Sequence, residues 1–174
     1  EPGAQPTHLP FGARQNLELN MGGRRIDRGP AGVMQPGVYE TLRARYRAAA
    51  DKLEKAGRID EAAFVLADLL DAPQEAVDLL ERHEKFEKAA RLAEGRTLAP
   101  EVTVRLWVLA KDLERATLLA RRHRVFGAVV TRLERGNLAE ARVLRLQWGE
   151  WLASSGDFGG AVQAVSPLEE ARSL

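Results

Sequence analysis

Side chains able to do acid–base or metal chemistry are few in this sequence. It holds three histidines and no cysteine, which excludes a disulfide framework, a thiolate metal site and a cysteine nucleophile. His83 and His123 could form a metal-binding or acid–base pair, but a 40-residue offset separates them. Each lies near the expected end of a helix, where imidazole interacts favourably with the helix dipole. We therefore interpret both histidines as structural.

The carboxylates and glycines do not indicate a catalytic centre either. Acidic residues pair with basic residues four positions away, as Glu81 does with Lys85, which is the spacing of salt bridges on a helix surface. The pairs at 22–23 and 159–160 lack the Lys-Ser or Lys-Thr of a phosphate-binding glycine loop. We predict that the protein is not an enzyme and that it has no catalytic, cofactor-binding or metal-binding residue.

Arginines form the one charged feature that suggests binding. Residues 101–145 hold ten basic and five acidic residues, although the whole chain is nearly neutral, with 26 basic and 25 acidic residues. If these arginines converge, they could bind phosphates or an acidic partner. The candidate partner-binding residues are Arg121, Arg122, Arg124, Arg132 and Arg135, with Arg142 and Arg145 nearby. The alternative is a solvated face, because helical spacing turns neighbouring side chains about 100° apart and no aromatic side chains are interleaved for base stacking.

Trp148 and Trp151 are three residues apart and share one face of an expected helix. With Leu144 and Leu152 they are typical of a core stripe. An exposed tryptophan pair would instead mark a partner interface.

Two regions differ in composition. Residues 1–38 hold five of the eight prolines, which disfavours a helix, and we expect an extended, non-helical N-terminal arm or linker, or a remnant strand of a preceding β domain. From 39 to 174 helical periodicity takes over and predicts an α-helical repeat domain. The expected helices span 40–56, 59–70, 74–83, 85–94, 100–111, 112–122, 125–135, 138–154, 157–165 and 167–172. The chain does not begin with Met, and we expect it to be a piece of a longer protein or assembly.

The helical region repeats. At an offset of 40 residues, Leu66, Leu69, Ala76, Leu79 and Phe86 match Leu106, Leu109, Ala116, Leu119 and Phe126. A shorter theme recurs as GRIDEA, EKFEKA, KDLERA, GNLAEA and GDFGGA, beginning at residues 57, 84, 111, 136 and 156. In each, one apolar residue follows the end of a helix, and an alanine three positions later allows the next helix to approach closely. We interpret the 40-residue offset as a pair of helix pairs.

These residues resemble the tetratricopeptide-like superfamily of α-solenoids, and most closely the degenerate repeats of clathrin heavy chain and of intraflagellar-transport and coat subunits. The resemblance covers about residues 40–165 and implies an all-α, right-handed solenoid of short antiparallel helix pairs, about eight to ten helices in all. The Trp, Gly and Tyr pattern of a regular tetratricopeptide repeat is absent, so the peptide-binding residues of that family are not carried over.

The sequence therefore predicts a non-enzymatic scaffold for a protein partner, located in the cytoplasm and not in a membrane, since no apolar run approaches the length of a transmembrane helix. An uncapped end of a solenoid also predicts a possible homo-oligomer. The alternative function is a nucleic-acid or polyanion binder that uses the Arg-rich segment 101–145.

Overall fold

The computed structural model describes residues 36–170, with side chains over 37–168, and this part of the chain is entirely helical. The predicted arm, apart from its last residues, lies outside this range. The helices are α1 (Pro36–Lys55), α2 (Ile59–Phe64), the π-helix η1 (Val65–Leu69), α3 (Pro73–Arg82), α4 (Phe86–Gly95), α5 (Pro100–Leu109), α6 (Leu113–His123), α7 (Phe126–Leu133), α8 (Leu138–Ser154) and α9 (Phe158–Glu170). The all-α prediction is confirmed for the described residues.

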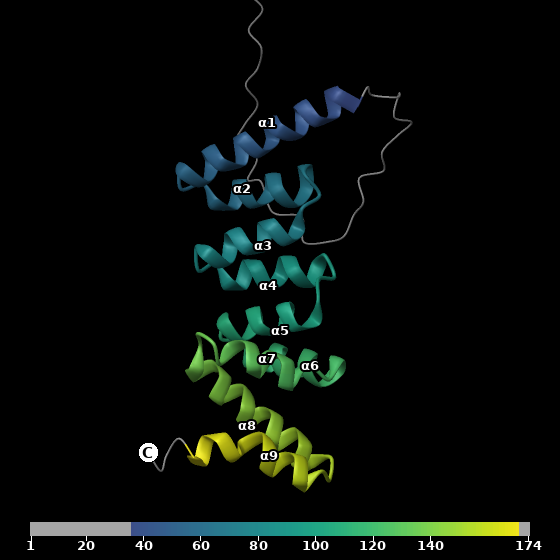
Figure 1. Cartoon of the computed structure of the whole chain (residues 1–174), viewed down its shortest axis with the longest axis vertical. Coiled ribbons are helices and arrows are strands. Elements are labelled where there is room, and N and C mark those ends of the chain that lie inside the picture. The colour runs from purple at the N-terminus through teal and green to yellow at the C-terminus, as the bar shows by residue number, and fades with distance from the viewer. Residues whose placement is uncertain (1–35, 171–174) are drawn as a thin grey trace, which may run out of the picture.

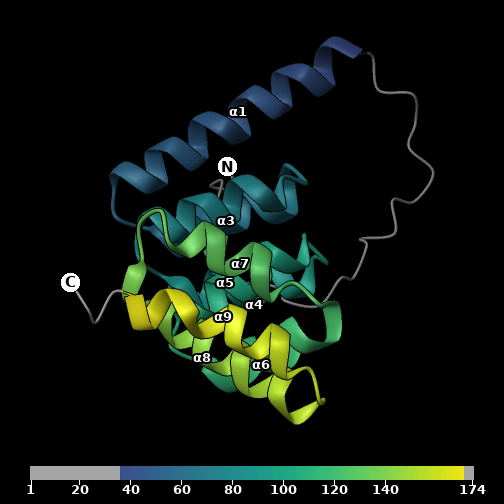
Figure 2. The same ribbon diagram turned by 60° about the horizontal axis from the view of Figure 1, so that its bottom comes forward.

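The helices are layered along the long axis of the molecule in nearly the order of the chain (Figure 1). From α1 to α5 each helix packs against the next, with η1 lying between α1 and α3. Farther on, α5 packs against both α6 and α7, and α8 packs against both of these helices. Finally α9 covers α8, at the end of the layered helices farthest from α1 (Figure 2).

Residues with left-handed backbone conformation separate the helices from α1 to α7 at a regular interval. Positive φ angles occur at residues 57, 71, 84, 97, 111 and 124, and a further one at Gly156 lies outside this series, between α8 and α9. The first six positions are 13 or 14 residues apart, so one helix and its turn occupy that length and two helices occupy about 27 residues. The 40-residue offset therefore advances the chain by three helices, from α3 to α6, and our interpretation of it as a pair of helix pairs is wrong.

Four of the five alanines of the recurring motif lie where close packing was expected. Ala62, Ala89 and Ala116 are fully buried and Ala141 is 1% exposed, whereas Ala161 is only partly buried. The core continues through all the layers from α2 to α8, and its largest fully buried side chains are Trp107 and Phe126. Phe126 of α7 stacks on Trp148 and Trp151 of α8, with ring centroids 6.3 and 5.5 Å away. Both tryptophans are partly buried and pack against the core, so they are not an exposed pair.

The first and the last helix differ from the predicted ones. The first helix begins at Pro36, inside the range expected to be an arm, because proline is well suited to the first turn of a helix. The last helix is continuous through Pro167, where two helices were predicted. In this turn the Ser166 hydroxyl donates to the Val162 carbonyl and the Arg145 guanidinium donates to the Ala164 carbonyl. These bonds satisfy carbonyl groups next to the one that proline leaves without an N–H donor.

The predicted helix 59–70 changes to a π-helix halfway along. The Leu70 amide donates to the Val65 carbonyl, five residues back, at 3.0 Å. The extra residue in this turn rotates the side chains that follow it. As a result Leu69 is 43% exposed, although its repeat partner Leu109 is only 8% exposed, while Asp68 turns inward.

A buried hydroxyl in α6 leads to a stability prediction. Thr117 is 7% exposed, and its Oγ1 has no hydrogen-bond partner among the described residues. The equivalent residue one 40-residue offset earlier is the fully buried Val77. Because an unsatisfied buried hydroxyl costs free energy that an isosteric methyl does not, Thr117→Val should stabilise the fold by about 1 kcal/mol. Urea unfolding measures this change. The control is Thr103→Val, which removes a hydroxyl that bonds the Ala99 carbonyl and should give no stabilisation.

Candidate interaction surfaces

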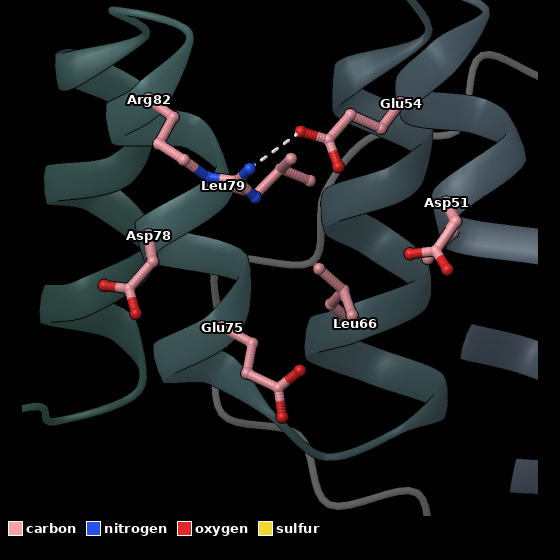
Figure 3. Close-up of a pocket in the computed structure, with 8 residues that line it drawn as sticks. Asp51, Glu54, Leu66, Glu75, Asp78, Leu79 and Arg82 are labelled. Atoms are coloured by element: carbon pink, nitrogen blue, oxygen red, sulfur yellow. Dashed lines mark ion pairs between the residues drawn. The ribbon is translucent and has the colours of Figure 1, made fainter. Parts of the chain in front are cut away.

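A groove with charged walls opens between α1 and α3. Its volume is about 250 Å³, and it is lined by Ala50, Asp51 and Glu54 of α1, Leu66 of η1, and Glu75, Asp78, Leu79 and Arg82 of α3. Figure 3 shows Leu66 and Leu79 between the two walls, with the carboxylates around them. The groove therefore combines an apolar floor with four carboxylates and one guanidinium.

Two of these carboxylates already have cationic partners. Glu54 accepts from Arg82 Nη1 and His83 Nε2, each at 3.1 Å, and Glu75 accepts from Arg47 at 2.6 Å. By contrast, Asp51 and Asp78 form no ion pair with any described residue, and Asp78 accepts only from the neutral Gln74 amide at 2.9 Å. The groove thus carries uncompensated negative charge on both walls, which suits a cationic group.

The five predicted partner-binding arginines are all exposed, but they lie in two places. Arg121 and Arg122 belong to the last turn of α6, and Arg124 follows at a left-handed position that ends the helix. Arg132 and Arg135 lie at the opposite end of α7, which separates the two groups by about 10 Å of helix. None of the five forms an ion pair with a described residue, so both groups offer free guanidinium groups to solvent.

The two nearby arginines, Arg142 and Arg145, differ in their surroundings. Arg142 is exposed, whereas the Arg145 side chain is only 15% exposed. Arg145 binds Glu134 at the end of α7 and donates to the Ala164 carbonyl of α9 at 3.1 Å. Its role is therefore to hold three helices together, which the sequence did not reveal because both partners are distant along the chain.

The two repeat-related histidines belong to different helices and have different surroundings. His83 ends α3 and contacts Glu54 of α1, while His123 is an exposed residue in the last turn of α6. No group of three or more His, Asp or Glu side chains suited to a metal ion occurs within residues 37–168. None of the helices between residues 36 and 170 is both long enough and apolar enough to cross a lipid bilayer.

An apolar surface on the last helix was not predicted. Phe158 and Val162 of α9 are 69% and 63% exposed, and no described residue covers them. They are four residues apart and so lie side by side on one face of the helix. One feature of the sequence could have revealed this surface: residues 158–168 contain no charged side chain, which is unusual for a helix with one face in solvent.

Ion pairs connect successive helix pairs and give the fold a dependence on pH. Asp60 of α2 binds Lys85 at 3.2 Å and Lys88 of α4 at 2.7 Å. Partial burial raises the pKa of the Asp60 carboxyl, but the hydrogen bonds and charges of the two lysines outweigh it and hold the pKa below its ordinary value of 3.8. In the same way, Lys111 lowers the pKa of Glu140.

We expect Asp60→Asn to change how stability depends on pH. Because the folded pKa is depressed, the Asp60 ion pairs contribute stability above the unfolded pKa and lose it as the pH falls through the folded value. The variant should therefore be less stable at neutral pH, by less than about 1 kcal/mol for a solvent-exposed site, and the difference should vanish in acid. Urea unfolding at a series of pH values measures it. A difference that persists below the folded pKa would contradict the assignment.

Over residues 36–170 the chain is all-α and is built from short, layered helices. Comparison with models of protein families, with curated proteins and with solved structures gives no match.

Proposed function

We propose that the chain is a non-enzymatic interaction scaffold, a right-handed α-solenoid of the tetratricopeptide-like kind that binds a protein partner. The observation that supports this proposal is the exposed pair of Phe158 and Val162 on α9. Exposed aromatic and branched side chains on a terminal helix are suited to helix-in-groove binding, in which neighbouring apolar residues act as anchors. The lack of cysteine agrees with a cytoplasmic location.

A peptide-display selection against the full chain tests this function. Enriched peptides should bind the wild-type chain and lose binding to Phe158→Asp with Val162→Asp, because the two substitutions place charge on the apolar surface. The control variant is Leu118→Asp, which changes a side chain that is 63% exposed on α6. Peptides that bind all three proteins equally would contradict a partner site on α9.

A second candidate function is polyanion binding, favoured by the five exposed arginines of α6 and α7. Titration with a labelled single-stranded oligonucleotide over a salt series tests it. Affinity should fall steeply with salt, and Arg121→Gln with Arg122→Gln should reduce the slope of that dependence. Absence of any salt-dependent binding removes this candidate.

A further inference from the structure

The charge of the chain is divided between two parts of the layered structure. Residues 59–95, which form α2 to α4, contain ten acidic and four basic residues, a net charge of −6. Residues 101–145, which form α5 to α7 and the first half of α8, contain five acidic and ten basic residues, a net charge of +5. The whole chain is close to neutral because these two parts cancel, and this division favours association between copies with unlike ends in contact.

Each part has a local feature that matches the other. The acidic part holds the groove between α1 and α3, in which Asp51 and Asp78 lack an ion pair with any described residue. The basic part presents Arg121, Arg122 and Arg124 together at the turn after α6. We call these two features the acidic groove and the arginine turn.

We propose that the arginine turn of one copy docks in the acidic groove of a second copy. An arginine has an apolar stem and a planar, always charged guanidinium group that bonds carboxylates through two donors. The stem matches the apolar floor, where Leu66 is partly exposed above the buried Ala50 and Leu79, and the guanidinium matches the carboxylates on the walls. A lysine also has an apolar stem, but its ammonium group is a point charge that does not match a carboxylate through two parallel donors.

The docking must occur between copies. The groove belongs to α1, η1 and α3, whereas the arginine turn joins α6 to α7 several layers away (Figure 1). The packing contacts of α6 and α7 are with α5 and α8, so the fold separates the two features within one chain. Since different surfaces meet, each bound copy keeps one free groove or one free turn, and the association is heterologous and can extend beyond a dimer. This inference uses surfaces other than Phe158 and Val162 of α9, so its test does not depend on the proposed function.

Sedimentation velocity of the full chain tests the proposal. At low ionic strength the weight-average mass should rise with concentration, and added salt should return it to the monomer value, because exposed ion pairs are screened. The groove variant Asp51→Lys with Asp78→Lys and the turn variant Arg121→Glu with Arg122→Glu should each raise the dissociation constant at least about tenfold. A wild-type chain that stays monomeric at every concentration and salt overturns the proposal.

Matched controls separate docking from net charge. Glu114→Lys with Glu150→Lys changes the charge as much as the groove variant does, on exposed positions of α6 and α8, and should associate at least as strongly as the wild type. Arg132→Glu with Arg135→Glu is the control for the turn variant, because these arginines lie at the other end of α7. If either control weakens association as much as its partner variant, the proposed surfaces are wrong.

Mixing the groove variant with the turn variant gives the most direct test. The groove variant retains its arginine turn and the turn variant retains its groove, so an equimolar mixture should form 1:1 dimers that cannot grow, although each variant alone is monomeric. A mixture that stays monomeric overturns the proposal. Circular dichroism verifies that each variant folds. Where charge reversal reduces the helical signal, Asp51→Asn with Asp78→Asn and Arg121→Gln with Arg122→Gln take the place of the reversed pairs, with the same expected pattern.

Discussion

Phe126→Ala should destabilise the fold by about 3–5 kcal/mol, the range for removing a fully buried aromatic side chain. Phe126 is 1% exposed and lies between Trp148 and Trp151, with its ring parallel to within 2° of the first and 26° of the second. Truncation to alanine removes both stacking contacts and leaves a cavity between α7 and α8, where rigid tryptophan rings prevent collapse. Urea or guanidinium unfolding followed by circular dichroism measures the loss.

The chain offers a control with the same change of residue. Phe158 of α9 is 69% exposed, so Phe158→Ala should alter the free energy of unfolding by no more than about 0.5 kcal/mol. Equal losses in the two variants would show that Phe126 does not form the buried junction between α7 and α8.

Asp68→Ala is expected to cost about 2 kcal/mol, between the values for exposed ion pairs and for fully buried ones that lose one partner, because this pair is partly buried. Asp68 of η1 binds Arg96, which follows the end of α4, and the two side chains are 11% and 18% exposed. Without the carboxylate, the guanidinium remains largely buried without a counter-charge. Denaturant unfolding at neutral pH measures the loss.

Two further variants distinguish this explanation from a general effect of lost charge. Glu87→Ala removes the partner of Arg91, but those side chains are 62% and 56% exposed, and the cost should stay below about 1 kcal/mol. Asp68→Leu combined with Arg96→Met should restore much of the stability, since Asp68 Oδ2 and Arg96 Nε have no partners in the native pair. A double variant less stable than Asp68→Ala would contradict this account.

The local structure followed from the sequence in most places. Helical periodicity and helix breakers such as Gly57 and Pro73 located most of the helices, because propensity and turn geometry act over a few residues. Four of the five motif alanines were correctly placed in the core for the same reason, and Ala161 is only partly buried. The sequence did not predict the π-helix η1 or the continuous helix through Pro167, where Arg145 of α8 donates to the Ala164 carbonyl.

The candidate surfaces depended far more on tertiary structure. The number of arginines drew attention to segment 101–145, but the fold shows that Arg121 lies in the last turn of α6 and Arg132 in the last turn of α7, so the two do not form one group. The acidic groove was not predicted, because Asp51 and Asp78 are 27 residues apart and meet only through the packing of α1, η1 and α3.

The sequence by itself determined that this protein is all-α over the described residues, where its helices begin and end to within a few residues, and which small residues are buried. These features depend on interactions within one or two helical turns. Only the tertiary structure decided which charges are paired, which are free and which apolar side chains stay exposed. The physical reason is that the rotation and crossing of each helix relative to its neighbours decide which side chains meet, and these are fixed by packing between residues that are distant along the chain.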